Sequence, residues 1–252
     1  MKSEGASFLL AVQFLTRLPV DTAKLYSPNR MANAIRYYPL VGGLVGGASA
    51  GVFLLADTVF PAALSVLFAM AAGLLITGAF HEDGLADTFD GIGGGLTRET
   101  ALQIMKDSRL GTYGTLALIT ALAIKFAALI AIPQTLIPLA FIVAHGLSRL
   151  SSVLVIATSE YVRGEGTAKP VAEAASATSL VIALVSGALL IGLWSIWLPL
   201  FALISGLVGL LIGHGLMRLF FERKLGGYTG DTLGAVQQAS EIGFYLGVLA
   251  WL

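Results

Sequence analysis

Cysteine is absent from the 252 residues, and charged residues make up only 12% of them. The lack of cysteine excludes disulfide bonds, thiol nucleophiles and thiolate metal sites, so any bound metal has oxygen or imidazole ligands. The 15 basic and 15 acidic residues cancel, and this balance gives no support for nucleic-acid binding. Apolar residues reach 56%, against roughly 45–50% in soluble proteins. A water-soluble globule is therefore a poor interpretation.

Long apolar windows recur along the chain, and most approach the roughly 20 residues that a membrane helix needs. They predict spans near residues 35–56, 62–80, 115–132, 138–157, 180–194 and 198–217, with a shorter last segment at 242–252. Residues 7–18 predict an amphipathic N-terminal helix that Pro19 closes. We expect an all-α polytopic membrane bundle with about six or seven transmembrane helices, in a single domain over residues 1–252. Glycines at 42–47 and 206–213 predict close packing between these helices.

Short and long connections alternate between the predicted spans. Tight turns at 57–61, 133–138 and 195–199 alternate with polar segments at 81–114, 158–179 and 218–241. Every lysine and arginine outside the spans lies in the polar segments or the N-terminal region, and the tight turns have none. Because basic residues are retained in the cytoplasm, we expect a multi-pass protein of the cytoplasmic (inner) membrane whose functional loops face the cytoplasm.

Four carboxylates, Glu82, Asp83, Asp87 and Asp90, lie at the start of the first polar segment. On a helix, Asp83, Asp87 and Asp90 fall within roughly 60° of one another. Such a stripe of like charges favours a bound cation, and hard oxygen ligands near solvent suit Mg²⁺. The alternative is a solvated acidic helix end. His81 and Glu82 point to other faces, where metal binding and proton transfer both stay open.

The same segment ends in groups that suit an anion. Gly111 and Gly114 let backbone N–H groups approach a phosphate at a helix start, and four side chains supply further donors: Lys106, Ser108, Arg109 and Thr112. Basic residues at a membrane boundary also set topology, so this motif alone is weak.

Two further places carry candidate residues. Asp231 and Thr232 begin the helix that leads to Glu241, as an N-cap or as ligands. Lys125 and Arg149 lie within or near spans, where an ionisable side chain suggests a functional site, although snorkelling explains Lys125 equally well. The other two histidines of the spans are expected to be satisfied interior residues: His145 and His214.

Together these motifs resemble the cobalamin synthase family, the adenosylcobinamide-GDP ribazoletransferases. The resemblance covers nearly the whole chain, through residues 14–19, 38–42, 81–91, 106–114, 148–149, 230–235 and Glu241. The pattern His-x-Asp-Gly-Leu-Ala-Asp-Thr-x-Asp-Gly is specific, and Glu82 departs from the family at a position that is often apolar. The resemblance implies that adenosylcobinamide-GDP and α-ribazole, or its 5′-phosphate, are joined to give adenosylcobalamin, or its phosphate, and GMP.

The resemblance also implies roles for single residues. Asp83, Asp87 and Asp90 would hold Mg²⁺ on the diphosphate. The substrate-binding residues would be Lys106, Ser108, Arg109, Thr112, Arg149, Asp231 and Thr232. His81, Asp107 or a spare aspartate would be the general base. The expected partners are the two substrates, the lipid bilayer and other late cobamide-assembly enzymes.

Two alternatives are weighed against this interpretation. A membrane CDP-alcohol phosphotransferase would require Asp-x-x-Asp-Gly-x-x-Ala-Arg, but Asp83 is followed by Gly-Leu-Ala-Asp. A transporter would place its charges near the membrane midplane and would usually have repeated halves. Here the carboxylates cluster at a boundary, and the sequence shows no repeat.

Overall fold

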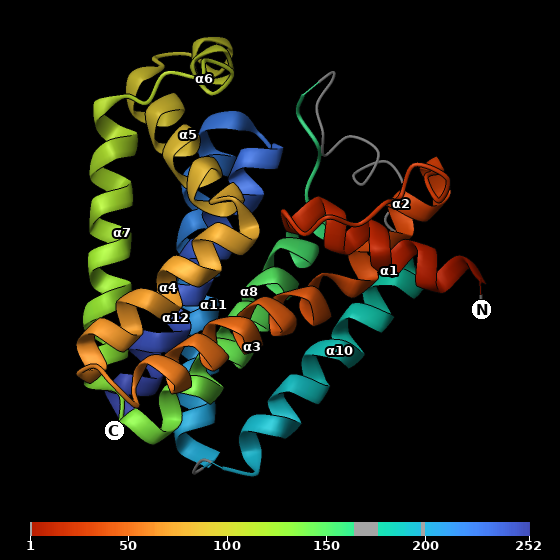
Figure 1. Ribbon diagram of the computed structural model, residues 1–252. Coiled ribbons are helices and arrows are strands. Elements are labelled where there is room, and N and C mark those ends of the chain that lie inside the picture. The colour runs from red at the N-terminus through yellow and green to blue at the C-terminus, as the bar shows by residue number, and fades with distance from the viewer. Residues whose placement is uncertain (1, 164–175, 198–199) are drawn as a thin grey trace.

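The structure, a computed structural model, describes residues 2–163, 176–197 and 200–252, and helices dominate these ranges (Figure 1). The only β-type pairing in the described ranges is an isolated bridge between Tyr161 and Tyr228. The elements are α1 (Lys2–Leu15), α2 (Pro28–Ala34), η1 (Ile35–Tyr37), α3 (Tyr38–Ala56), α4 (Ala62–Thr77), α5 (Phe80–Gly94), α6 (Arg98–Ile104), α7 (Thr112–Ala131), η2 (Gln134–Leu136), α8 (Ile137–Thr158), α10 (Ala177–Ser195), α11 (Leu200–Leu225) and α12 (Gly230–Trp251). The predicted all-α class is confirmed.

Five helical stretches are long and apolar enough to cross a membrane, and the bent pair α4–α5 would make six. The expected polytopic bundle is therefore confirmed, at the lower edge of the expected number of spans. The predicted last segment at 242–252 forms the C-terminal part of α12, which runs unbroken over 22 residues from Gly230 and includes the helix predicted to lead to Glu241. The first half of α12 carries Gln237, Gln238 and Glu241, which interrupt the apolar pattern but are buried among polar partners.

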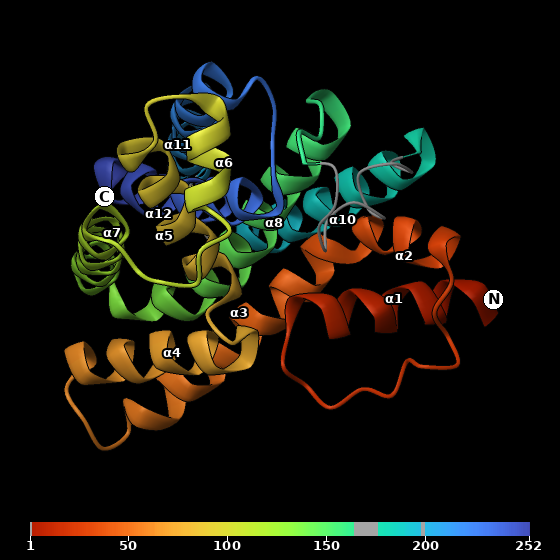
Figure 2. The same ribbon diagram turned by 90° about the horizontal axis from the view of Figure 1, so that it is seen from above.

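The two kinds of connection lie at opposite ends of the bundle. Figure 1 shows the α3–α4 turn, the α7–α8 turn and the end of α10 at the lower end, while α6 and the loop before α12 lie at the upper end. At the lower end the Gln134 amide donates to both carboxylate oxygens of Asp57, at 2.6 and 2.5 Å, so two of the turns are joined. Seen from above, α7 and α1 lie at opposite edges (Figure 2).

A sharp bend of 85° separates α4 from α5. Gly78 has φ +65° and Ala79 has φ +55°, so two successive residues leave the right-handed helical region. A Cβ on Gly78 would run into the side chain of Arg17, whose backbone N–H donates to Ile76 at 2.7 Å. The predicted span at 62–80 therefore ends earlier, at Thr77, and α5 leaves in a new direction with the acidic stretch.

Glycines mediate the closest helix contacts, as the sequence predicted. Gly42 and Gly46 of α3 face the backbone of α8, and Gly209 of α11 faces Gly243 of α12, with no room for a Cβ at any of them. Small residues let these backbones touch and maximise van der Waals contact where the hydrophobic effect adds little. This packing places α3, α8, α11 and α12 together at the centre of the molecule.

Candidate active site

The acidic stretch of α5 meets the start of α12 at a crossing built on two glycines. A Cβ on Gly84 would lie 2.6 Å from the backbone oxygen of Asp231, and one on Gly234 would lie 2.8 Å from that of His81. Glycine at both positions permits this close backbone approach. Two motifs that are far apart in the sequence are therefore in direct contact, and the crossing brings His81 and Asp83 next to Asp231.

A short bridge fixes the loop before α12 against the segment that follows α8. The backbone N–H of Val162 donates to Tyr228 at 3.0 Å, and that of Tyr228 donates to Glu160 at 2.8 Å. This pairing carries Arg163 to Asp231, where the guanidinium and carboxylate lie 2.7 Å apart. Arg163 was not among the predicted site residues, since nothing in its local sequence distinguishes it from other basic residues at a membrane boundary.

A cavity of about 60 Å³ lies beside the α5–α12 crossing. Four of the predicted site residues line it, namely His81, Asp83, Arg149 and Asp231, together with aromatic rings. Asp83 is exposed, whereas His81 is 5% exposed and Arg149 only 1%. The polar lining therefore runs from the surface into the interior, where electrostatic interactions are less screened.

Three carboxylates lie close enough to repel one another, namely Asp83 and Asp231, which line this cavity, and Asp87 beside them. The negative charges of Asp231 and Asp83 act on Asp87, and that of Asp83 acts on Asp231. Among the described residues, no three Asp, Glu, Cys or His side chains are gathered tightly enough to form a metal-binding group. The donor chemistry nevertheless fits Mg²⁺, because these are hard oxygen ligands close to solvent. The Mg²⁺ site stays a prediction, with Asp231 as a further donor beside Asp83 and Asp87.

Asp90 has a different environment from the other two aspartates of its stripe. Its carboxylate is buried and accepts hydrogen bonds from the backbone N–H groups of Gly111, at 2.7 Å, and Gly114, at 2.8 Å. These are the N-cap and the third residue of α7, whose first N–H groups have no partner within the helix. Asp90 therefore caps α7 from α5, and its predicted metal role would come in addition to this one.

The loop at 105–111 is held next to Asp90, away from the cavity. Asp90 follows Asp83 by seven residues, or roughly 10 Å along the helix. None of the predicted residues of this loop lines the cavity, nor does Thr112, which starts α7. Instead, the Arg109 guanidinium pairs with Asp107 at 2.5 Å in an exposed position. The structure thus does not bring Lys106, Ser108, Arg109 and Thr112 together with the cavity, and their roles stay predictions.

The partner of Asp107 also affects its chemistry. Hydrogen bonds from the side chain and backbone of Arg109 lower the pKa of the Asp107 carboxyl to about 2. A carboxylate with so low a pKa is a weak proton acceptor at neutral pH. Of the two residues named as a general base, His81 and Asp107, the position at the cavity favours His81.

Thr232 is engaged in the start of its own helix. Its hydroxyl accepts from the backbone N–H of Thr229 at 2.9 Å, and Thr229 accepts in turn from the N–H of Thr232. This capping box makes Thr229 the N-cap of α12, in place of Asp231. Asp231 is thereby left facing the carboxylates of α5, and substrate binding by the fully buried Thr232 stays a prediction.

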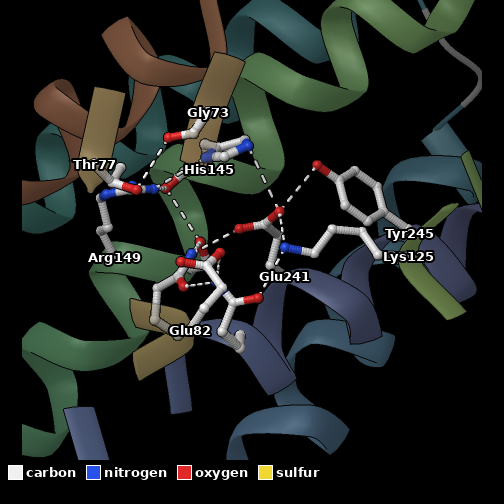
Figure 3. A network of polar contacts seen from close by, with 11 residues as sticks. Gly73, Thr77, Glu82, Lys125, His145, Arg149, Glu241 and Tyr245 are labelled. Atoms are coloured by element: carbon white, nitrogen blue, oxygen red, sulfur yellow. Dashed lines mark hydrogen bonds and ion pairs between the residues drawn. The ribbon is translucent and has the colours of Figure 1, made fainter. Parts of the chain in front are cut away.

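A buried polar network lies deeper, between α5, α7, α8 and α12 (Figure 3). Lys125 pairs with Glu241 at 2.9 Å and donates to Gln238 at 2.8 Å. Gln238 donates to Glu82 at 2.8 Å, and Gln237 donates to Glu241 at 2.7 Å. Lys125 is 5% exposed, so snorkelling does not explain it. The network holds two acidic and two basic side chains, counting Arg149, and its formal charge cancels.

Arg149 connects this network to the cavity, because it lines both, as does His81. One guanidinium nitrogen of Arg149 donates to the backbone oxygen of His145 at 2.8 Å and lies 3.3 Å from its Nδ1. Among the described residues no carboxylate forms an ion pair with Arg149, and its Nε has no hydrogen-bond partner. A buried guanidinium with spare donors is suited to an anion.

The remaining histidines have polar partners, as expected, but each is only partly buried. His145 lies 3.6 Å from Glu241 through Nε2, and His214 lies 2.6 Å from the Ser151 hydroxyl. The network partners that sequence reasoning missed are Gln237 and Gln238, and it underrated Glu82. The available signal was a row of polar side chains at helical spacing within an otherwise apolar helix.

Comparison with known proteins supplies the remaining observation. Residues 7–249 match the family model described as cobalamin-5-phosphate synthase. An adenosylcobinamide-GDP ribazoletransferase of Shewanella baltica (strain OS185) is 45% identical over 247 residues, covering 96% of this chain and 93% of the relative. One of Shewanella frigidimarina is 43% identical over 251 residues, covering 96% and 94%. No solved structure matches the chain.

Proposed function

The chain belongs to the cobalamin-5-phosphate synthase family, and on this premise we propose that it joins adenosylcobinamide-GDP with α-ribazole or its 5′-phosphate. A ribose hydroxyl of the nucleoside forms a new bond to the phosphorus attached to cobinamide. The bond from that phosphorus to the bridging oxygen breaks, and GMP leaves with this oxygen. The corrinoid is a substrate here and not a bound cofactor.

The α5–α12 crossing is the observation that supports this assignment within the structure. It places a histidine, a buried guanidinium and two carboxylates around one cavity, and a transfer at phosphorus depends chiefly on positioning and on stabilising negative charge. Arg149 is assigned to a non-bridging phosphate oxygen, because its Nε has no hydrogen-bond partner in the part of the chain that the structure describes. His81 is assigned to the proton of the attacking hydroxyl.

Asp83 and Asp87 would hold Mg²⁺, with Asp231 as the added carboxylate. When bound, Mg²⁺ would neutralise charge on the diphosphate and on the departing GMP. The pairing of Asp231 with Arg163 leaves a positive charge next to the cluster, which reduces repulsion between the carboxylates. Asp90, whose oxygens are occupied by the amides of α7, would contribute least to the metal.

The upper end of the bundle is proposed to face the cytoplasm, in the inner membrane. The predicted polar segments hold the basic residues outside the spans, and α6 and the loop before α12, which belong to these segments, lie at the upper end (Figure 1). Both substrates are water-soluble and would enter from this side. Late cobamide-assembly enzymes would supply them there.

The proposal is tested with protein purified in detergent or reconstituted in liposomes. Incubation with adenosylcobinamide-GDP and α-ribazole should yield cobalamin and GMP in equal amounts with Mg²⁺, and neither product in EDTA. The absence of both products from folded, Mg²⁺-supplied protein would refute the transferase assignment. Product formation that EDTA leaves unchanged would refute only the metal requirement.

A further inference from the structure

A second, larger cavity of about 370 Å³ adjoins the candidate active site. Its size lies within the range of small-molecule sites, roughly 300–1,000 Å³, whereas the cavity at the crossing is far smaller. We define it as the α1 groove, because α1 and the loop that follows form most of its wall. The residues that line it are Leu10, Gln13, Phe14, Thr16, Arg17, Tyr26, Met31, Thr77 and Phe80.

Two aromatic rings separate the α1 groove from the active-site cavity. Phe14 and Phe80 line both spaces and contact each other edge to face, with centroids 5.5 Å apart. Phe14 also stacks on Tyr38 at 6.0 Å, and Phe80 lies edge to face against His81 at 5.4 Å. A molecule in the groove would therefore contact Phe80, whose other side packs against His81, the residue assigned to the attacking hydroxyl.

The lining of the α1 groove combines flat rings with an unpaired cation. Tyr26 is 54% exposed, so its ring is available as a stacking surface. The Arg17 guanidinium makes no hydrogen bond or ion pair with any residue of the described ranges, although its backbone is fixed by Ile76. Aromatic rings favour a flat heteroaromatic base, and a free guanidinium favours a phosphate.

We propose that the α1 groove binds the attacking nucleotide, with its base against the aromatic rings and its 5′-phosphate on Arg17. This inference rests on the proposed function and adds the location of one substrate. The name of the family includes a 5-phosphate, which only the incoming nucleotide would bring to the product. The reacting ribose hydroxyl then extends past Phe14 and Phe80 toward His81. The single phosphate of the leaving GMP lies at the reacting diphosphate and is therefore not available to Arg17.

Arg17→Gln tests the assignment with two forms of one substrate. The KM for α-ribazole 5′-phosphate should rise at least about tenfold, as expected for the loss of one charge-assisted contact. The KM for α-ribazole should change by less than about twofold, because that substrate has no phosphate to lose. Lys24→Gln removes an exposed charge from the same loop outside the groove and is the matched control; it should alter neither KM.

Two more variants separate the base from the phosphate. Tyr26→Ala should raise the KM for both forms of α-ribazole by the same factor, since it removes ring contact and no charge. Arg17→Lys should recover part of the affinity for the phosphorylated form. Binding of α-ribazole 5′-phosphate measured by calorimetry on the purified protein gives the same comparison without turnover.

The outcomes that overturn the inference are distinct from failure of the proposed function. If Arg17→Gln binds both forms like the wild type, or raises both values equally, the phosphate does not lie on Arg17. A rise only in the KM for adenosylcobinamide-GDP would assign the groove to the guanosine half. A wild-type protein that binds α-ribazole 5′-phosphate in an Arg17-dependent way but forms no product would uphold the groove and refute the transferase assignment.

Discussion

The two ends of the acidic stripe on α5 have opposite surroundings. Asp83 and Asp87 lie close to a third carboxylate, Asp231, at the α5–α12 crossing, while Asp90 is buried against the backbone amides of Gly111 and Gly114. The three aspartates have the spacing of a single stripe, yet the packed partner differs at each end. A common helical face therefore does not imply a common role, because the partner is supplied by tertiary contacts.

The largest expected effect is a difference in activity between variants of α5 beside Asp231 and variants of the loop at 105–111. Asp87→Asn should reduce the rate of GMP release at least about a thousandfold if Asp87 positions the metal for phosphoryl transfer. Asp107→Asn removes an equal charge from the loop and should retain activity within about threefold, since its carboxylate pairs with Arg109 in an exposed position away from Asp83 and Asp231. The two rates are measured on protein of matched expression. Comparable losses of activity in both variants would show that Asp87 and Asp107 do not differ in their importance for the reaction.

The next largest effect is expected at the crossing of α5 and α12, which brings Asp83 and Asp87 near Asp231. Gly84→Ala places a Cβ 2.6 Å from the backbone oxygen of Asp231, and overpacking of this kind costs about 1–3 kcal/mol. We expect a lower thermal unfolding temperature in detergent and a loss of activity, because α5 must move away from α12. Gly47→Ala is the matched control, since a Cβ there meets nothing within 4 Å. Unchanged stability of Gly84→Ala would mean that the crossing is looser than described.

A smaller effect is expected at the capping end. Asp90→Ala leaves two amides at the start of α7 without their acceptor and should destabilise the protein by about 1–3 kcal/mol. Thermal unfolding in detergent measures this loss. The Mg²⁺ concentration for half-maximal activity should stay near the wild-type value. A large increase in that concentration would instead show that Asp90 is also a metal ligand.

The smallest effect is expected from titration of Asp107. Because Arg109 lowers its pKa to about 2, any stability that the pair contributes is present above the ordinary carboxyl range and is lost only as the pH falls toward 2. Between pH 5 and 9 the carboxylate stays ionised. Asp107→Asn should therefore leave the pH dependence of GMP release unchanged, and displacement of its acidic limb would restore Asp107 as a candidate base.

Much of the fold could be predicted because the membrane imposes it. Apolar windows and turn residues located most of the helices, and glycines located their contacts, since both follow from local composition. The bend at Gly78 and Ala79 was not predicted, because it depends on the contact with Arg17. The helix that leads to Glu241 and the segment at 242–252 were predicted separately, because an average of hydropathy falls at Gln238 and Glu241, although both side chains are buried among partners on other helices.

The sequence by itself determined the chemistry: a membrane helical bundle without thiols, whose functional groups are carboxylates, guanidinium groups and imidazoles. Residue identity sets these properties before any contact forms. Only the tertiary structure decided which groups meet. Asp231 lies near Asp83 and Asp87, Asp90 caps α7, and Glu82 accepts a hydrogen bond from Gln238. These contacts depend on the packing of α5 against other helices, above all on its close crossing with α12, which neither segment determines alone.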